Sequence, residues 1–180
     1  MRIIAGAAKG RRLVGPKGSG TRPMMDRAKE AIFSSLGPRV VDATVLDLYA
    51  GSGSLGLEAL SRGAADAVFV ERSRIALEAL RTNVTAVDLG GSVVARDVEV
   101  FLADSTDTFD MAFVDPPYAL ALPSVANVLG LLAPRLAEGA VVILHRRAGG
   151  APPDLPTGLV EVDRRRYGDA EITRIEKEAA

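Results

Sequence analysis

The stretch Thr44–Gly56, TVLDLYAGSGSLG, joins an apolar strand to a glycine-rich turn and to the start of a helix. Its apolar beginning is typical of a strand buried on both faces of a parallel sheet. Gly51, Gly53 and Gly56 follow, and glycine allows both a tight turn and a close approach of the backbone to a ligand. Glu71 ends the next apolar run, where a carboxylate can accept the two hydroxyls of a ribose. The stretch therefore predicts a site for a nucleoside-containing cofactor.

Two cofactor classes fit this turn. A Gly-x-Gly-x-x-Gly turn followed by an acid is typical of nicotinamide dinucleotide sites as well as of other nucleoside sites. The chain lacks the Gly-Lys-Ser/Thr ending of a P-loop, and it has no Gly-x-Ser-x-Gly elbow for a hydrolase nucleophile. The glycine turn by itself therefore leaves the identity of the cofactor open.

Apolar strands alternate with helices after the turn. We expect strands at 67–70, 93–95, 109–114 and 140–144, and helices at 55–61, 73–87, 98–103 and 125–136. Two last strands, 159–165 and 171–175, are joined only by the turn 167–169 and form an antiparallel hairpin. The predicted fold class is α/β, with a doubly wound, seven-stranded, mostly parallel sheet and a C-terminal antiparallel hairpin. This Rossmann-like, class I architecture is that of many methyltransferases that depend on S-adenosylmethionine (SAM).

The first 30 residues are strongly basic, with eight Lys or Arg and two acids, although the 180-residue chain has a net charge of −1. Short apolar runs at 2–5 and 11–14 predict a β-hairpin, and a loop rich in Gly, Pro and Ser follows it. We divide the chain into a basic N-terminal extension, residues 1–23, and the main α/β domain, residues 24–180, which opens with a helix to Leu36 and which we expect to be the SAM-dependent methyltransferase domain. A basic arm on an acidic body indicates an anionic partner, and a merely solvated terminus is the alternative.

The composition excludes several classes of protein. The chain has 0 Cys and 1 His, which excludes a disulfide framework, a cysteine nucleophile and an ordinary zinc site. Aromatic residues make up 4%, too few for a groove that stacks single-stranded bases. Apolar runs are shorter than the roughly 20 residues of a membrane span, and the N-terminus has no signal-peptide core. We expect a cytoplasmic protein with no membrane contact and no metal.

The sequence Asp115-Pro116-Pro117-Tyr118 follows the expected strand 109–114. Two consecutive prolines cannot continue a strand, so the chain leaves the sheet rigidly at the edge where ligands of such folds bind. The Asp115 carboxylate and the Pro116 carbonyl could accept both N–H bonds of an exocyclic amine, while Tyr118 stacks on the flipped-out base. The motif therefore indicates methyl transfer to the amino group of a nucleobase, and a buried aspartate that caps a Pro-Pro turn is the alternative.

Together the two motifs resemble the methyltransferases that modify adenine N6, cytosine N4 or guanine N2. The whole chain resembles one family among them, the bacterial 16S ribosomal RNA methyltransferases that modify N2 of guanine 966. The matching segments are RIIAG (2–6), GRRL (10–13), TRP (21–23), DRAKEAIF (26–33), LDLYAGSGSLGLEALSRGA (46–64), FVE (69–71), Asn83, Asp97, FD (109–110), DPPY (115–118) and YG (167–168). The resemblance implies a SAM-dependent enzyme whose partner is 16S rRNA or the assembling small ribosomal subunit, and we expect a monomer.

The resemblance also implies roles for individual residues at the cofactor and amine sites. Asp47 and the backbone of Gly51 and Gly53 would hold the methionine part of SAM, Glu71 its ribose, and Asp97 and the Val98 backbone would lie by the adenine. Thr21, Arg22 and Asp26 would cover the cofactor, and Asp115, Pro116 and Tyr118 would be the catalytic residues. From the charge of the arm, we expect Lys9, Arg11 and Arg12 to bind RNA phosphate rather than bases.

Three other functions stay open. A nicotinamide oxidoreductase would use the same turn and Glu71, but it would leave the Asp-Pro-Pro-Tyr motif without a purpose. A non-catalytic ribosome-assembly factor would need only the basic arm. DNA or RNA adenine-N6 methylation is the nearest alternative within the enzyme class, because the motif itself does not separate adenine from guanine.

We assign no catalytic role to the single histidine or to the run of three arginines near the C-terminus. His145 is the single histidine and directly follows the expected strand 140–144, so we interpret it as a polar strand end. Arg164–Arg166 is interpreted either as a solvated edge that discourages pairing between sheets or as an RNA contact.

Overall fold

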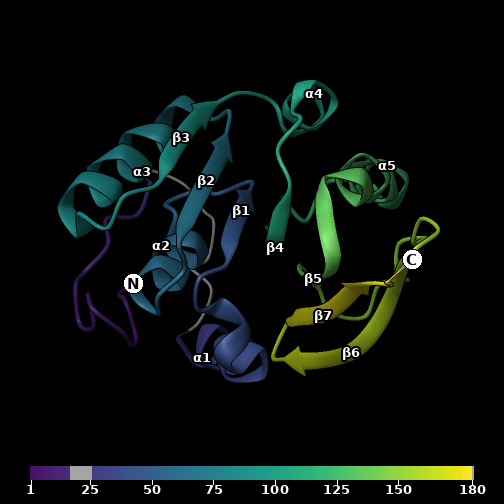
Figure 1. The fold of residues 1–180 in the computed structure, drawn as a ribbon, viewed down its shortest axis with the longest axis horizontal. Helices are drawn as coiled ribbons and strands as arrows, with labels where there is room; N and C mark the ends of the chain where they lie inside the picture. The colour runs from purple at the N-terminus through teal and green to yellow at the C-terminus, as the bar shows by residue number, and fades with distance from the viewer. Residues whose placement is uncertain (17–25, 180) are drawn as a thin grey trace.

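The computed structural model describes residues 1–16 and 26–179, and a seven-stranded sheet forms its centre (Figure 1). The strands lie in the order β3-β2-β1-β4-β5-β7-β6. Neighbours from β3 to β5 pair in parallel, and β7 pairs antiparallel with both β5 and β6. The strand bounds are β1 Thr44–Leu48, β2 Asp66–Glu71, β3 Ser92–Ala95, β4 Phe109–Val114, β5 Leu136–Arg147, β6 Leu159–Tyr167 and β7 Ala170–Lys177. The predicted parallel sheet with an antiparallel C-terminal hairpin is confirmed.

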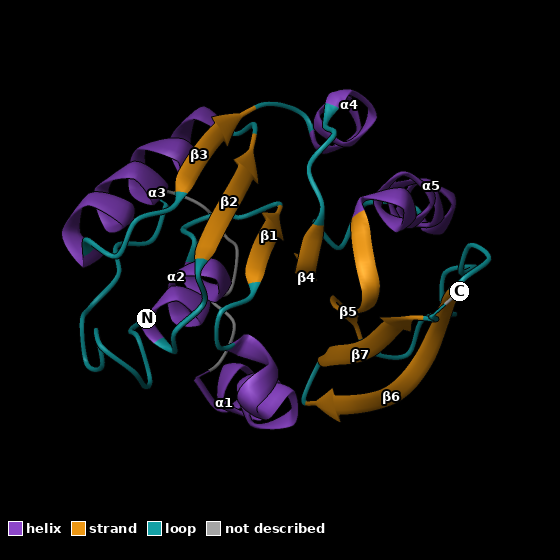
Figure 2. Cartoon of the chain, viewed as in Figure 1, coloured by secondary structure: helices purple, strands orange, loops and turns teal. Residues whose placement is uncertain are grey.

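Helices cover both faces of the sheet, as the doubly wound prediction requires (Figure 2). The helix bounds are α1 Asp26–Leu36, α2 Ser54–Ser61, α3 Arg74–Val87, α4 Val98–Asp104 and α5 Leu122–Leu132, with 3₁₀ turns η1 Gly37–Val40 and η2 Ala133–Arg135. Successive strand residues point to opposite faces, so Val45 joins the core under α1, α2 and α3, and Leu46 the core under α4 and α5. None of the helices in the described ranges has the length and apolarity that a bilayer crossing requires.

Helix α5 begins and ends earlier than the predicted helix 125–136. Pro123 lies in its first turn, where a missing N–H costs no intrahelical hydrogen bond. Pro134 lies in η2, which ends the helix, and β5 follows directly at Leu136. The two prolines therefore shift the helix toward the N-terminus of the predicted range.

Strand β5 is longer than the predicted strand 140–144. Its pairing with β7 continues as far as Arg147, which lies opposite Ala170. His145 therefore lies inside a paired strand and opposite Ile172, and not after the strand end. The sequence prediction stopped too early because the polar residues from His145 onward carry no apolar signal.

The N-terminal extension forms a narrow hairpin that packs on the domain. Its arms meet at one bridge, Arg2 opposite Arg12, and in hydrogen bonds such as the one from Ile3 N to Arg11 O at 2.9 Å. Ile3 and Leu13 are buried in the core that also contains α1, α2 and α3. The predicted β-hairpin is thus present as backbone pairing without regular strands. The predicted domain boundary at residues 23 and 24 lies outside the described residues.

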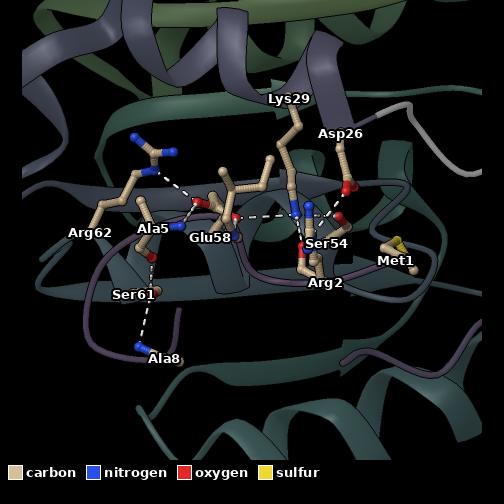
Figure 3. A network of polar contacts seen from close by, with 12 residues as sticks. Met1, Arg2, Ala5, Ala8, Asp26, Lys29, Ser54, Glu58, Ser61 and Arg62 are labelled. Atoms are coloured by element: carbon tan, nitrogen blue, oxygen red, sulfur yellow. Dashed lines mark hydrogen bonds and ion pairs between the residues drawn. The ribbon is translucent and has the colours of Figure 1, made fainter. Parts of the chain in front are cut away.

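A buried ion pair fastens the extension to the domain (Figure 3). Lys29 of α1 and Glu58 of α2 are 1% and 0% exposed, and their Nζ and Oε2 atoms lie 3.1 Å apart. The Glu58 carboxylate also accepts hydrogen bonds from Ile4 N at 2.8 Å and Ala5 N at 3.0 Å, while Lys29 donates to Arg2 O at 2.6 Å. The Glu58 carboxylate, whose Oε1 also pairs with Arg62 Nε at 2.8 Å, therefore joins two helices and the backbone of the extension.

Candidate active site

The glycine-rich turn lies at the carboxyl end of β1 and leads into α2. Gly51 and Gly53 have φ angles of 57° and 79°, which glycine adopts readily. Tyr49 also has a positive φ, 59°, which is uncommon for a residue with a side chain. A Cβ atom on Gly56 would lie 2.4 Å from a ring carbon of Phe69, so glycine is needed for α2 to approach β2 this closely. The turn has the tight geometry that its sequence predicts.

Asp47 lies beneath this turn. Asp47 is 2% exposed, and its Oδ2 accepts a hydrogen bond from Gly56 N at 2.9 Å. Burial raises the pKa of Asp47 well above its usual range, the Gly56 hydrogen bond opposes this, and the Asp115 and Glu71 carboxylates raise the pKa further. The carboxyl edge of the sheet thus brings three carboxyl groups together, and a cationic ligand would stabilise their charged forms.

Glu71 ends β2 with its carboxylate fixed by three backbone N–H groups. Its Oε2 accepts from Gly51 at 2.9 Å, and its Oε1 accepts from Arg72 at 2.8 Å and from Ser73 at 2.7 Å. A carboxylate offers about four acceptor positions, so Oε2 keeps one position for a further donor. This arrangement suits one ribose hydroxyl, and a second would have to share an acceptor position that a backbone N–H already occupies.

Asp97 follows β3 and caps α4. Its Oδ1 accepts from the N–H groups of Glu99 and Val100, and the Arg72 guanidinium donates to Oδ2 at 2.8 Å. Val98, the first residue of α4, is buried. Asp97 therefore lies at the expected edge of the sheet, and its carboxylate already accepts hydrogen bonds from the first turn of α4.

Of the three residues predicted to lie over the cofactor, the structure describes only Asp26. Thr21 and Arg22 lie outside the described residues. Asp26 opens α1, and its Oδ2 accepts from Arg2 Nε at 3.2 Å. This contact ties the start of α1 to the extension, and a cofactor contact by Asp26 stays a prediction.

The Asp115-Pro116-Pro117-Tyr118 motif leaves the sheet at the carboxyl end of β4, as predicted. Asp115 N donates to Leu48 O at 3.4 Å, which keeps the motif beside β1 and the glycine turn. The Arg146 guanidinium donates to Pro117 O at 3.3 Å and to Leu120 O at 2.9 Å, and so holds the loop after the motif. Tyr118 is 43% exposed, so its ring is accessible to a base.

His145 of β5 contacts this motif, although the sequence analysis had placed it outside the site. Its Nδ1 lies 2.6 Å from Asp115 Oδ1 and its Nε2 lies 3.3 Å from the Tyr118 hydroxyl. His145 is 7% exposed, so both contacts are made by a side chain that is nearly inaccessible to solvent. The signal that could have found it is topological, because β4 and β5 are parallel neighbours whose carboxyl ends share one edge.

The Tyr118 hydroxyl keeps its proton at neutral pH. Partial burial raises the pKa of Tyr118, and the Asp115 and Asp169 carboxylates raise it further, against the opposing effect of Arg147 and Arg146. A protonated phenol can donate a hydrogen bond to a neighbouring nitrogen acceptor.

A cavity of about 340 Å³ lies beside Tyr118, between the end of β5 and the β6–β7 hairpin. Arg146, Arg147 and Arg164 are among its lining residues. Arg164 forms ion pairs with Glu161 and, at 3.5 Å, with Glu171. Of the three arginines considered at Arg164–Arg166, Arg164 therefore lines a hollow next to the predicted amine site.

The basic residues of the extension lie along α2 and α3. Lys9, Arg11 and Arg12 are all exposed. Arg11 donates to Ala86 O near the end of α3, and the turn before Lys9 is held by a hydrogen bond from Ala7 N to Ser61 O at the end of α2. Helices α2 and α3 both start at the carboxyl edge of the sheet, so the tip of the hairpin lies at the opposite, amino edge. The binding of RNA by Lys9, Arg11 and Arg12 stays a prediction.

Comparison with known proteins matches the chain to one family. The family described as Conserved hypothetical protein 95 matches residues 1–176. The chain belongs to the Conserved hypothetical protein 95 family. The Escherichia coli (strain K12) protein named Ribosomal RNA small subunit methyltransferase D is 38% identical over 159 residues, which are 87% of this chain and 79% of the relative. The Haemophilus influenzae protein of the same name is 37% identical over 131 residues, which are 70% of this chain and 68% of the relative.

Solved structures share the fold of this family member over its whole length. The Escherichia coli protein yhhF superposes with a TM-score of 0.89 at 33% identity, covering 100% of this chain and 99% of that one. The hypothetical protein TTHA0928 of Thermus thermophilus superposes with a TM-score of 0.82 at 34% identity, covering 99% of each chain. A structure of SMU.776 complexed with SAH shares only the fold, with a TM-score of 0.71 at 13% identity over 86% of this chain and 50% of that one. The predicted class I methyltransferase fold is confirmed.

Proposed function

We propose that this family member is a SAM-dependent methyltransferase that modifies N2 of guanine 966 in 16S ribosomal RNA. The observation that carries the proposal is the Asp115-Pro116-Pro117-Tyr118 motif at the end of β4, beside the glycine turn. Relatives named Ribosomal RNA small subunit methyltransferase D support ribosomal RNA as the substrate. The choice of guanine N2 over adenine N6, and of position 966, follows from the resemblance of the whole chain to that family.

The residues at the carboxyl edge fit SAM. Among residues 1–16 and 26–179, a Cβ atom on Gly51 would meet nothing nearer than Tyr49 O at 3.9 Å, so these residues leave room for a ligand on this side of the turn. When bound, SAM supplies a methyl group on a positively charged sulfonium, and this charge suits the carboxyl groups of Asp47, Glu71 and Asp115. A nicotinamide dinucleotide would instead bring two phosphate charges beside the same acids. The charge of the site therefore favours SAM over the dinucleotide.

The amine site provides orientation rather than a covalent intermediate. Asp115 accepts one N–H of the guanine amine and the Pro116 carbonyl accepts the other, and Pro117 presents no N–H donor beside this carbonyl. These two bonds hold the nitrogen toward sp³ geometry, which withdraws its lone pair from the ring and aims it at the methyl donor, and they strengthen as the nitrogen acquires charge. The nitrogen would form its new bond to the methyl carbon as the carbon–sulfur bond breaks, and that electron pair would stay on the sulfur, which leaves as a neutral thioether. Asp115 would hold the proton that the nitrogen sheds until water removes it.

Each site residue of this proposal comes from one chain, so a monomer suffices for the reaction. The substrate is 16S rRNA or the assembling small subunit, and a ribosomal substrate places the enzyme with ribosomes in the cytoplasm. Tyr118 stacks on the flipped-out guanine, and the cavity beside it has room for part of a neighbouring nucleotide.

Calorimetry with SAM and NAD tests the choice of cofactor. We expect the chain to bind SAM and not NAD, and we expect Glu71→Ala to weaken SAM binding by roughly ten- to a hundredfold because a charged acceptor is lost. Asp66→Ala is the matched control, since Asp66 is an exposed acid at the opposite end of the same strand. Unchanged SAM affinity in Glu71→Ala would remove Glu71 from the cofactor site.

The salt dependence of RNA binding tests the basic arm. Replacing Lys9, Arg11 and Arg12 together by Ala should flatten the slope of log K against log salt by about two to three units, because each neutralised phosphate contributes about 0.7 to 0.9. The RNA KM should rise, and SAM affinity should hardly change. An unaltered slope would contradict the prediction and would move RNA docking to the arginines beside Tyr118.

A further inference from the structure

The contacts of His145 favour one tautomer of the neutral imidazole. An ionised carboxylate only accepts hydrogen bonds, so the Nδ1 atom at 2.6 Å from Asp115 Oδ1 must carry a proton. A neutral imidazole has one N–H, so Nε2 is an acceptor and the Tyr118 hydroxyl donates to it across 3.3 Å. A chain of two hydrogen bonds therefore runs from Tyr118 through His145 to Asp115.

We infer that His145 is a positioning residue that fixes Asp115 and Tyr118 relative to each other and leaves the second Asp115 oxygen for the amine. The inference rests on the proposed function and adds a residue to its amine site. His145 is nearly inaccessible to solvent, whereas Asp115 and Tyr118 remain partly exposed. His145 therefore acts from behind the two groups that would meet the base, and it does not touch the base itself.

The position of His145 in the sheet makes this support rigid. Residues on either side of it pair with β7, where Leu144 lies opposite Thr173 and Arg146 opposite Glu171. On the other side, β4 pairs with β5 up to Val114 and Leu144, directly before Asp115 and His145. Asp115, directly after β4, and His145, within β5, therefore lie at the same level of the sheet, and loop motion is not needed to bring them together. The Tyr118 ring and the imidazole pack in a T-shaped arrangement, with ring centroids 5.7 Å apart.

The single histidine allows a direct spectroscopic test without any substrate. In a long-range ¹H–¹⁵N correlation spectrum of the labelled chain, the imidazole signals need no assignment because the sequence has 1 His. We expect Nδ1 to be protonated and Nε2 to be unprotonated, and we expect Asp115→Asn to change both signals. An imidazole protonated at Nε2 alone would overturn the inference.

Three variants separate the two hydrogen bonds in the reaction. His145→Asn keeps an N–H donor near the Nδ1 position, His145→Gln places its amide near the Nε2 position, and His145→Leu keeps neither group. In single-turnover methyl transfer to small-subunit RNA, we expect His145→Leu to be roughly ten- to a hundredfold slower, the size of one hydrogen bond to a charged group. His145→Asn should recover most of the rate and His145→Gln little of it.

The binding constants distinguish positioning from a general loss of structure. We expect SAM affinity and RNA KM to stay within about twofold in all three variants, since no His145 atom needs to touch either ligand. Equal rates in all three variants and in the wild-type chain would overturn the inference while leaving the proposed function standing. A wild-type chain that transfers no methyl group would instead refute the proposed function, and the spectrum of the imidazole would still test the hydrogen-bond chain.

Tyr118→Phe adds an independent check on the coupling. It removes the hydroxyl and keeps the stacking ring, so we expect a rate loss of a few-fold in the wild-type chain and none in the His145→Leu background. A double-mutant cycle measures this difference. Additive effects of the two substitutions would show that the Tyr118 hydroxyl and His145 act separately, which contradicts the chain of hydrogen bonds.

Discussion

Asp115→Ala should abolish methyl transfer and leave SAM binding nearly intact. Asp115 lies at the end of β4 beside the proposed amine, and its carboxylate is the acceptor that orients the nitrogen. Loss of one group that stabilises charge developing in a reaction typically slows it by about a hundred- to a thousandfold. The His145 imidazole also loses its partner at 2.6 Å, which adds to the loss of order in the site. Single-turnover rates with labelled SAM, together with calorimetric SAM affinity, measure both quantities.

Asp110→Ala is the matched control for this experiment. Asp110 belongs to the same strand but lies near its amino end, where its Oδ2 accepts from Thr44 N at 2.8 Å. We expect the control to transfer methyl groups at the wild-type rate. If Asp115→Ala also kept the wild-type single-turnover rate, the assignment of the amine site would be wrong.

Glu58→Ala should lower the free energy of unfolding by about 3–5 kcal/mol, the cost of breaking a buried ion pair by removing one partner. Lys29 is 1% exposed and would lose the carboxylate that lies 3.1 Å from its Nζ. The N–H groups of Ile4 and Ala5 would lose their acceptor at the same time. Urea unfolding measures the change, and Glu78→Ala on the exposed face of α3 is the control, with an expected change within about 0.5 kcal/mol.

The free energy of unfolding of Glu58→Ala should also depend on pH, because Lys29 stays buried without its partner. Burial lowers the pKa of Lys29 below its usual 10.5, and Glu58 opposes this shift. Without Glu58 the pKa falls further, so the unfolded chain binds more protons than the folded chain between the lowered pKa and 10.5. Stability of Glu58→Ala should therefore rise with pH in this window. A variant as stable as the wild-type chain at neutral pH would show that the pair does not hold the extension on the domain.

The sheet could be predicted because its strands are nearly continuous apolar runs with helices between them. The edge that carries the site followed from the same reasoning, since Glu71 and Asp115 directly follow such runs. The strand and helix ends were less accurate where polar residues or prolines occur, as in the extension of β5 to Arg147 and the shift of α5. These ends depend on pairing with β7 and on local turn geometry, which apolar periodicity does not report.

The contacts between distant side chains could not be predicted. The sequence predicts a separate extension of residues 1–23, whereas Ile3 and Leu13 enter the core and Glu58 binds the backbone of the extension. A glutamate inside the apolar run LGLEAL was the available signal. His145 was missed for a related reason, because its role depends on which strand lies beside β4 and not on its neighbours in the sequence.

Nucleoside analysis of labelled small-subunit RNA tests the central claim most directly. The chain is incubated with methyl-labelled SAM and with 16S rRNA or small subunits that lack the modification, and the RNA is then digested to nucleosides. The account predicts that the label appears in N2-methylguanosine and disappears when guanine 966 is replaced. Label in N6-methyladenosine, or no transfer to either form of the substrate, would contradict it.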